Sequence, residues 1–122
     1  MKDNSQVMIM NTIDWLIKNS DSKIRLDCDF GSSGLWTSKG QNIGFASELF
    51  PHEIMTRITK WQKDYDDNLF PIAPNYGEAS KSWWDSHFAE RNAIAIELQK
   101  ILGNNIDVVV WESDAWIKID AK

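Results

Sequence analysis

The two histidines are the residues of this chain best suited to acid–base or metal chemistry. His52 falls where a helix is expected to begin, and His87 lies in a second expected helix near Asp85 and Glu90. A catalytic or metal site needs groups that converge, and the sequence contains no HxH, HExxH or paired Cys/His spacing. We therefore expect both histidines to be surface or interfacial residues. The alternative is a small hydrolase or metal-dependent enzyme that uses His87 with a neighbouring carboxylate.

Three other motifs match reactive sites only loosely. The aspartates Asp64, Asp66 and Asp67 lack the glycine and the distal glutamate of an EF-hand calcium loop. Residues 31–34, Gly-Ser-Ser-Gly, fit neither phosphate-loop pattern, so we expect a turn there. Cys28 is the only cysteine, which excludes an internal disulfide and a cysteine-based metal site. We expect no cofactor, no metal and no enzymatic activity.

The composition is that of a globular protein with an acidic surface. A chain of 122 residues is long enough to bury its own core, so we expect one domain over residues 1–122. The net charge of −5 argues against a nucleic-acid partner, because affinity for phosphate comes largely from Lys and Arg. The same charge suits a basic protein partner. There is no signal-peptide core and no long apolar run, so we expect a cytoplasmic protein without membrane contact.

Two long helices are predicted, over residues 47–68 and 80–102. Each carries an apolar stripe at the 3.6-residue period of a helix with one buried face. The stripes consist of Ile54, Ile58, Trp61 and Tyr65 in the first helix and of Trp84, Phe88, Arg91, Ala95, Leu98 and Leu102 in the second. Gly103 stands where a helix ends in the left-handed conformation. A shorter helix is expected over residues 7–17, although a run this apolar also fits a strand.

Alternating apolar and polar residues predict the strands. Over residues 23–30, Arg25, Asp27 and Asp29 alternate with apolar residues, which indicates a half-buried strand with its polar side exposed. Further strands are expected at 35–37, 42–45, 106–111 and 115–119, and a loop at 70–79. This order predicts an α+β fold, with two long helices and a short N-terminal helix packed on a mainly antiparallel sheet.

Exposed acids and two tryptophans are the candidate partner-binding residues. Seven tryptophans is a high count for this length, and Trp is the residue that most often anchors interfaces. Trp36 follows a Gly-rich turn and Trp116 lies on a terminal strand, so these two are the most expected to be exposed. The full candidate set is Asp27, Asp29, Trp36, Asp64, Asp66, Asp67, Glu112, Asp114 and Trp116.

A pattern of short motifs links this chain to a known class of proteins. It runs through Asp29-Phe30-Gly31, Leu35-Trp36, Leu49-Phe50-Pro51, Arg57, Trp61 and Tyr65-Asp66. Over Ile24 to Val110 in outline, it resembles immunity proteins of bacterial polymorphic or contact-dependent growth inhibition toxin systems. The resemblance implies a protein that binds and neutralises a cognate toxin domain, commonly a basic nuclease, by occluding its active site. It implies no catalytic residue.

A third interpretation belongs to another class. The chain would be a structural or adaptor subunit that forms a homodimer through its Trp-rich strands. The residues alone leave this alternative and the oligomeric state open.

Overall fold

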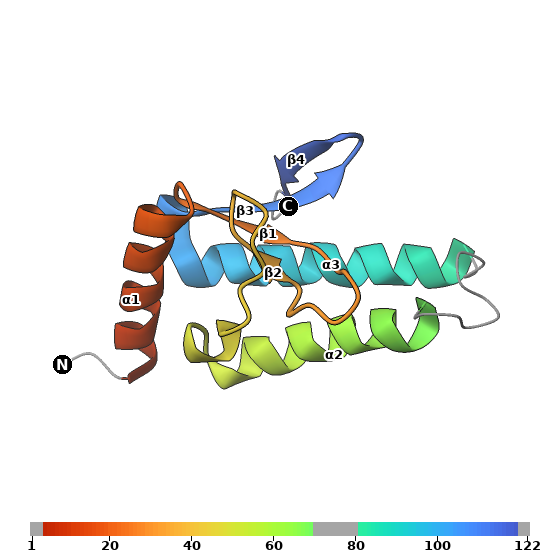
Figure 1. Ribbon diagram of the computed structural model, residues 1–122, viewed down its shortest axis with the longest axis horizontal. Helices are drawn as coiled ribbons and strands as arrows, with labels where there is room; N and C mark the ends of the chain where they lie inside the picture. The colour runs from red at the N-terminus through yellow and green to blue at the C-terminus, as the bar shows by residue number, and fades with distance from the viewer. Residues whose placement is uncertain (1–3, 70–80, 120–122) are drawn as a thin grey trace.

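Three helices and a four-stranded sheet make up the part of the chain that the computed structural model describes, residues 4–69 and 81–119 (Figure 1). The helices are α1 (Asn4–Asn19), α2 (His52–Leu69) and α3 (Lys81–Leu102), with single 3₁₀ turns at Ala46–Glu48 and Gly103–Asn105. The strands are β1 (Lys23–Leu26), β2 (Leu35–Trp36), β3 (Asp107–Glu112) and β4 (Ala115–Lys118). The predicted α+β class and the three helices are confirmed, while the loop expected at 70–79 lies outside the described residues.

The sheet has the strand order β2-β1-β3-β4. The outer pairs, β1–β2 and β3–β4, are antiparallel, and the central pair β1–β3 is parallel. A parallel pair needs a long crossover connection, and α2 and α3 lie in the segment that joins the two central strands. The sheet is therefore mixed but mainly antiparallel, as predicted.

Two predicted strands differ from the structure. Residues 42–45 form only an isolated bridge, between Asn42 and Trp36, because the chain turns into the 3₁₀ helix that begins at Ala46. The first strand ends at Leu26 instead of reaching residue 30. Beyond it the chain folds into a turn in which Ser32 N donates to Asp29 O at 3.1 Å and Gly31 adopts a φ of +72°.

The core lies between the sheet and the helices. One face of the sheet supplies Ile24, Leu26, Leu35, Val108 and Val110, and these pack with Leu16 of α1, Ile58 and Trp61 of α2, and Ile94 and Leu98 of α3. Gly103 has a φ of +72° and ends α3 as predicted, because a glycine adopts this conformation without strain. The predicted burial of Ile54, Ile58, Trp61 and Leu98 is confirmed.

The predicted burial of Phe88 is wrong. Its side chain is 41% exposed, whereas the preceding residue, His87, is buried. The buried face of α3 consists of His87, Arg91, Ile94, Ala95, Leu98 and Leu102. Near the start of α3 this face is rotated by one residue from the expected stripe, because the rings of Trp61 and Trp83 enclose His87.

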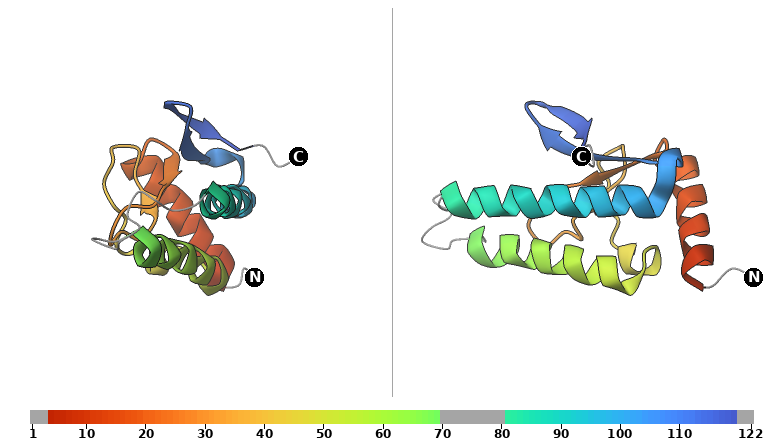
Figure 2. Two further views of the ribbon diagram at one scale, coloured as in Figure 1. Left: turned by 90° about the vertical axis from the view of Figure 1, so that its right-hand side faces the viewer. Right: turned by 180° about the vertical axis from the view of Figure 1, so that it is seen from behind.

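Helix α1 lies across one end of the α2–α3 pair (Figure 2). Leu16 is fully buried, and Thr12 Oγ1 is within hydrogen-bonding reach of the carbonyl oxygens of Met8 and Leu49. Its outward side exposes Val7, Met10 and Ile17. The β3–β4 hairpin lies on the side of α3 away from α2 (Figures 1 and 2).

Candidate functional site

The second face of the sheet is turned away from the helical core. Residues that are partners across neighbouring strands point to the same side of a sheet. Arg25 is the register partner of Trp36 on one side and of Val109 on the other, and Lys118 is in turn the partner of Val109. These side chains form a row on what we call the outer face. Its members are Lys23, Arg25, Trp36, Asp107, Val109, Trp111, Trp116 and Lys118.

The β3–β4 hairpin places two tryptophans together on the outer face. Ser113 and Asp114 have φ values of 52° and 64°, as a two-residue type I′ turn requires. This turn makes Trp111 the direct partner of Trp116, and their ring centroids are 5.3 Å apart in an edge-to-face arrangement. Trp111 is 46% exposed and was missed among the candidates. The sequence signal that could have found Trp111 is the two-residue turn at 113–114, because such a turn pairs residue 111 with residue 116.

A hollow of about 240 Å³ brings together four of the predicted site residues. It is lined by Asp27, Asp29, Trp36 and Trp116, together with Arg25, Cys28 and Gly40. The sequence predicted Asp27 and Asp29 on the exposed face of the first strand. Because β1 ends at Leu26, both residues lie instead on the loop after the strand. Trp36 Nε1 donates a hydrogen bond of 2.9 Å to the carbonyl oxygen of Asp27, which ties the indole ring to this loop.

Carboxylates from the loop and from α2 act on the same thiol. The pKa of Cys28 is raised, first by burial and then by the negative charges of Asp27, Asp66 and Asp64. The thiol therefore stays protonated and is a poor nucleophile. The pKa of Asp27 is also raised, mainly because its carboxyl is partly desolvated, while Arg91 opposes the shift and Asp29 adds to it. Asp66 of α2 contacts the loop after β1 through Gly31 N, whereas Asp64 lines a hollow between α2 and α3.

The three acids of α2 have different surroundings. Asp66 Oδ1 accepts hydrogen bonds from Gly31 N at 3.1 Å and from Gln62 Nε2 at 3.0 Å, so it holds the loop after β1 against the helix. Asp67 forms an exposed ion pair of 2.7 Å with Lys63. Asp64 is exposed and accepts a hydrogen bond from Asn68 Nδ2 at 3.0 Å. Asp66 therefore has a structural role, whereas the carboxylates of Asp64 and Asp67 face solvent.

The two acids near the hairpin turn also differ. Glu112 Oε1 lies 3.1 Å from Nη2 of Arg91, a residue that is only 3% exposed. Arg91 Nη1 also donates to the carbonyl oxygen of Trp111 at 3.0 Å, so Glu112 and the end of β3 compensate a buried charge. Asp114 is exposed in the turn. Glu112 therefore helps to hold the hairpin on α3, while Asp114 is a surface charge.

The prediction that His87 is a surface residue is wrong, because its side chain is buried. It is 6% exposed and stacks between Trp61 and Trp83, with ring centroids 4.9 Å away on each side. Burial lowers its pKa to about 4, more than the opposing charge of Asp64 raises it, and Arg91 lowers it further. The imidazole is therefore neutral at pH 7. Within the described residues its buried Nδ1 has no hydrogen-bond partner.

The alternative of an enzyme that uses His87 with Asp85 or Glu90 fails because both carboxylates pair with other residues. Glu90 makes two hydrogen bonds, of 2.7 and 2.8 Å, to Arg57, and Asp85 pairs with Lys81 at 2.6 Å. Neither carboxylate is a hydrogen-bond partner of His87. Over residues 4–69 and 81–119, no three His, Cys, Asp or Glu side chains are grouped so that they could hold a metal ion.

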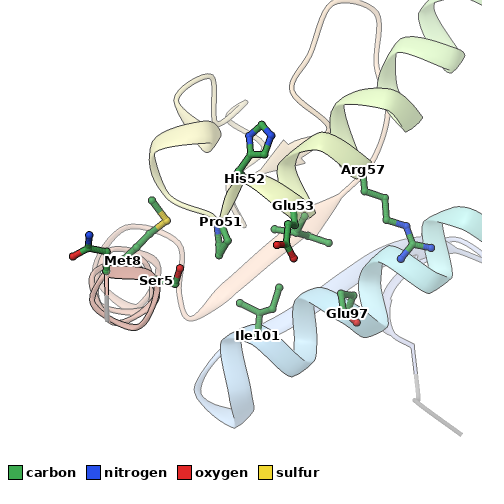
Figure 3. A pocket seen from close by; sticks show the side chains of 10 residues that line it. Ser5, Met8, Pro51, His52, Glu53, Arg57, Glu97 and Ile101 are labelled. Atoms are coloured by element: carbon green, nitrogen blue, oxygen red, sulfur yellow. The ribbon is translucent and has the colours of Figure 1, made fainter. Parts of the chain in front are cut away.

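A larger hollow, of about 720 Å³, lies elsewhere, between α1, the start of α2 and the end of α3 (Figure 3). Its lining includes Ser5 and Met8, then Pro51, His52, Glu53 and Arg57, and finally Glu97 and Ile101. His52 is the only titratable candidate there that the sequence had singled out, and its Nε2 lies 3.3 Å from Thr56 Oγ1. Ser5, His52 and Glu53 also line this hollow, and among the described residues no hydrogen bond joins any two of these three side chains.

Comparison with protein families gives a match that covers most of the chain. Residues 22–113 match the family described as Serratia CdiI immunity protein-like. The matched span contains β1, β2, α2, α3 and β3, and it leaves α1 and β4 outside. A comparison with curated proteins found no match.

Proposed function

The chain belongs to the Serratia CdiI immunity protein-like family, and we propose that it neutralises its cognate CdiA toxin by covering it with the outer face of its sheet. Membership makes the protein a non-enzymatic immunity protein whose role is toxin neutralisation. Such a protein needs a stable scaffold and a complementary surface instead of an active site. The proposal concerns which surface this is and what it does to the toxin.

The tryptophans of the outer face, of which Trp111 is exposed and Trp36 and Trp116 are half-buried, support the proposal most directly. Trp111 is the most exposed of the large aromatic residues in the described part of the chain, and it contacts the half-buried Trp116. Trp36 lies on the same face across β1. Large aromatic side chains beside a hollow are the typical anchors of protein interfaces, and a contiguous exposed group of them marks an interaction surface.

The acids around this face support a basic partner. Asp27 and Asp29 border the hollow, and Asp114 lies at the tip of the hairpin. Opposite charges speed association, while buried aromatic residues slow dissociation. In this proposal the toxin is a basic nuclease whose active site is occluded, and neutralisation takes place in the cytoplasm. Within the described residues, no helix has the length and apolar character needed to span a membrane.

The test is binding of the purified cognate CdiA toxin domain, followed by its inhibition. Replacing Trp111 or Trp116 with Ala should weaken binding by about 2 kcal/mol, or about thirtyfold, mainly through faster dissociation. Phe45→Ala is the matched control, because Phe45 is a similarly exposed aromatic residue that lies outside the outer face. If both Trp variants bind and protect as the parent does, the outer face is not the interface.

A homodimer through the same tryptophans is the alternative. Sedimentation equilibrium of the isolated protein separates the two, because a dimer buried through Trp111 and Trp116 would become monomeric in Trp111→Ala. A parent protein that is monomeric at micromolar concentration would remove the dimer.

A further inference from the structure

The centre of the outer face is positively charged, although the chain as a whole is acidic. Lys23, Arg25 and Lys118 all project from this face, and the Arg25 guanidinium lies 4.4 Å from the centroid of the Trp116 ring. The acids described above border this strip on the side of the loop after β1 and at the hairpin turn. The outer face therefore alternates in charge instead of presenting one sign.

Some of these charges already have partners. Lys118 Nζ pairs with Asp107 Oδ1 at 3.2 Å, and Asp21 Oδ2 accepts a hydrogen bond from Ser38 Oγ at 3.0 Å. In contrast, the side chains of Lys23 and Arg25 make no hydrogen bond or ion pair with any described residue. Arg25 thus has a cation–π contact, but no described residue supplies an acceptor for its five N–H groups.

Arg25 and Trp116 stand between two hollows. Both residues line the hollow of about 240 Å³ that contains Asp27 and Asp29. Both also line a second hollow, of about 430 Å³, together with Lys23, Asp107 and Lys118. With one face of the guanidinium packed on the indole, its edges remain available to a group that enters from solvent.

Desolvation connects the tryptophan to the arginine. A protein that covers Trp116 also removes water from the guanidinium stacked on it. A charge buried without an acceptor strongly opposes binding, so a partner that uses Trp116 as an anchor must bring an acceptor to Arg25. A carboxylate matches the guanidinium in charge and in its two-pronged geometry.

We infer that Arg25 is the docking point for an Asp or Glu side chain of the toxin, which enters beside Trp116. This inference rests on the proposed function, since it assumes that the toxin covers the outer face. It makes Arg25 a residue that determines specificity: the toxin must present an acidic group at the centre of the contact and basic groups around it. The alternation in sign then allows only one orientation of the toxin on the sheet.

The test combines variants of both proteins with the purified cognate CdiA toxin domain. Arg25→Gln should weaken binding at least about tenfold through faster dissociation, and Arg25→Lys should also weaken it, because lysine keeps the charge but loses the two-pronged contact. Lys18→Gln is the control, since Lys18 is an exposed cation on α1, away from the outer face. Thermal unfolding of each variant identifies any loss of binding caused by misfolding.

A double-mutant cycle then identifies the partner group. Each surface Asp and Glu of the toxin is changed to Asn or Gln and measured against parent and Arg25→Gln. One of these changes should weaken binding to the parent about tenfold and have little effect on binding to Arg25→Gln. Arg25→Glu combined with Arg at that toxin position should recover part of the lost affinity.

The outcomes separate this inference from the proposed function. Weak binding by Trp116→Ala with parental binding by Arg25→Gln would overturn the inference and leave the interface in place. Parental binding by both variants would remove the interface and the inference together. A loss with Arg25→Gln that couples to no toxin carboxylate would overturn the assignment of an acidic partner group.

Discussion

His87 offers a prediction about stability whose size follows from its surroundings. Its ring is buried between Trp61 and Trp83, and the pKa is lowered to about 4 from an ordinary 6.5. The folded protein therefore disfavours the imidazolium form, whereas the unfolded chain accepts the proton freely. The contribution of neutral His87 to the free energy of unfolding should be complete above pH 6.5. It should be lost as the pH falls from 6.5 towards 4.

Much of this loss of stability falls between pH 7 and pH 5, where most carboxylates remain ionised. Between pH 7 and pH 5, the difference in proton binding by a histidine with these two pKa values amounts to about 2 kcal/mol of unfolding free energy. At pH 5 protonation of the histidine in the unfolded chain supplies most of the effect, because its ordinary pKa of 6.5 lies well above that pH. A loss of this size is a substantial part of the stability of an ordinary domain.

The assay is urea denaturation of the parent and of His87→Phe at pH 7, 6 and 5. Phenylalanine keeps an aromatic ring between the two tryptophans but cannot be protonated, and it removes the unpaired Nδ1. The parent should lose about 2 kcal/mol more than the variant on acidification from pH 7 to pH 5. His52→Phe is the matched control, because His52 is exposed. Parallel pH profiles for parent and His87→Phe would refute the claim that His87 is buried in its neutral form.

Three further predictions concern single side chains. Ile58 is fully buried, so Ile58→Ala should reduce the free energy of unfolding by about 2–5 kcal/mol in urea denaturation, and a loss below about 1 kcal/mol would contradict its central position. Asp27→Asn should raise thermal stability at pH 7, because the charged carboxyl is disfavoured in the folded state, and the gain should vanish as the pH falls below the ordinary carboxyl pKa of 3.8. Asp64→Asn should slow toxin association at low salt without changing stability. Asp66→Asn should also lower the melting temperature, because it weakens the hydrogen bond from Gly31 N. Equal melting temperatures for these two variants would show that Asp66 does not hold the loop.

The helices were predictable because their signal is local and repeated. Residues 47–68 and 80–102 were expected, and α2 and α3 cover His52–Leu69 and Lys81–Leu102. The period alone did not determine which side of α3 is buried, because a stripe through Phe88 and one through His87 have nearly the same spacing. The choice depends on the stacking of Trp61 from α2 on His87, which is a contact between distant parts of the chain.

The sequence named four residues that line the hollow beside the outer face, but it did not predict their arrangement. Asp27, Asp29, Trp36 and Trp116 were named from sequence, but their meeting in one hollow depends on the parallel pairing of β1 with β3. Strand order of this kind is set by packing over the whole core and leaves no local signature. The positive strip on the outer face has the same origin, because Arg25 and Lys118 become neighbours only when β1, β3 and β4 lie side by side.

The family match also separates β4 from the rest of the proposed toxin-binding face. The family match ends at residue 113, so it contains the core strands and the two long helices but not β4. Trp116 and Lys118 lie on β4, at the edge of the sheet, where a change of side chain leaves the buried core intact. Trp116 nevertheless contacts Arg25 and Trp111, which lie inside the matched span. In the proposed function, β4 completes the surface that binds the toxin, and it does so at the edge of the sheet, where a change of side chain costs the core little.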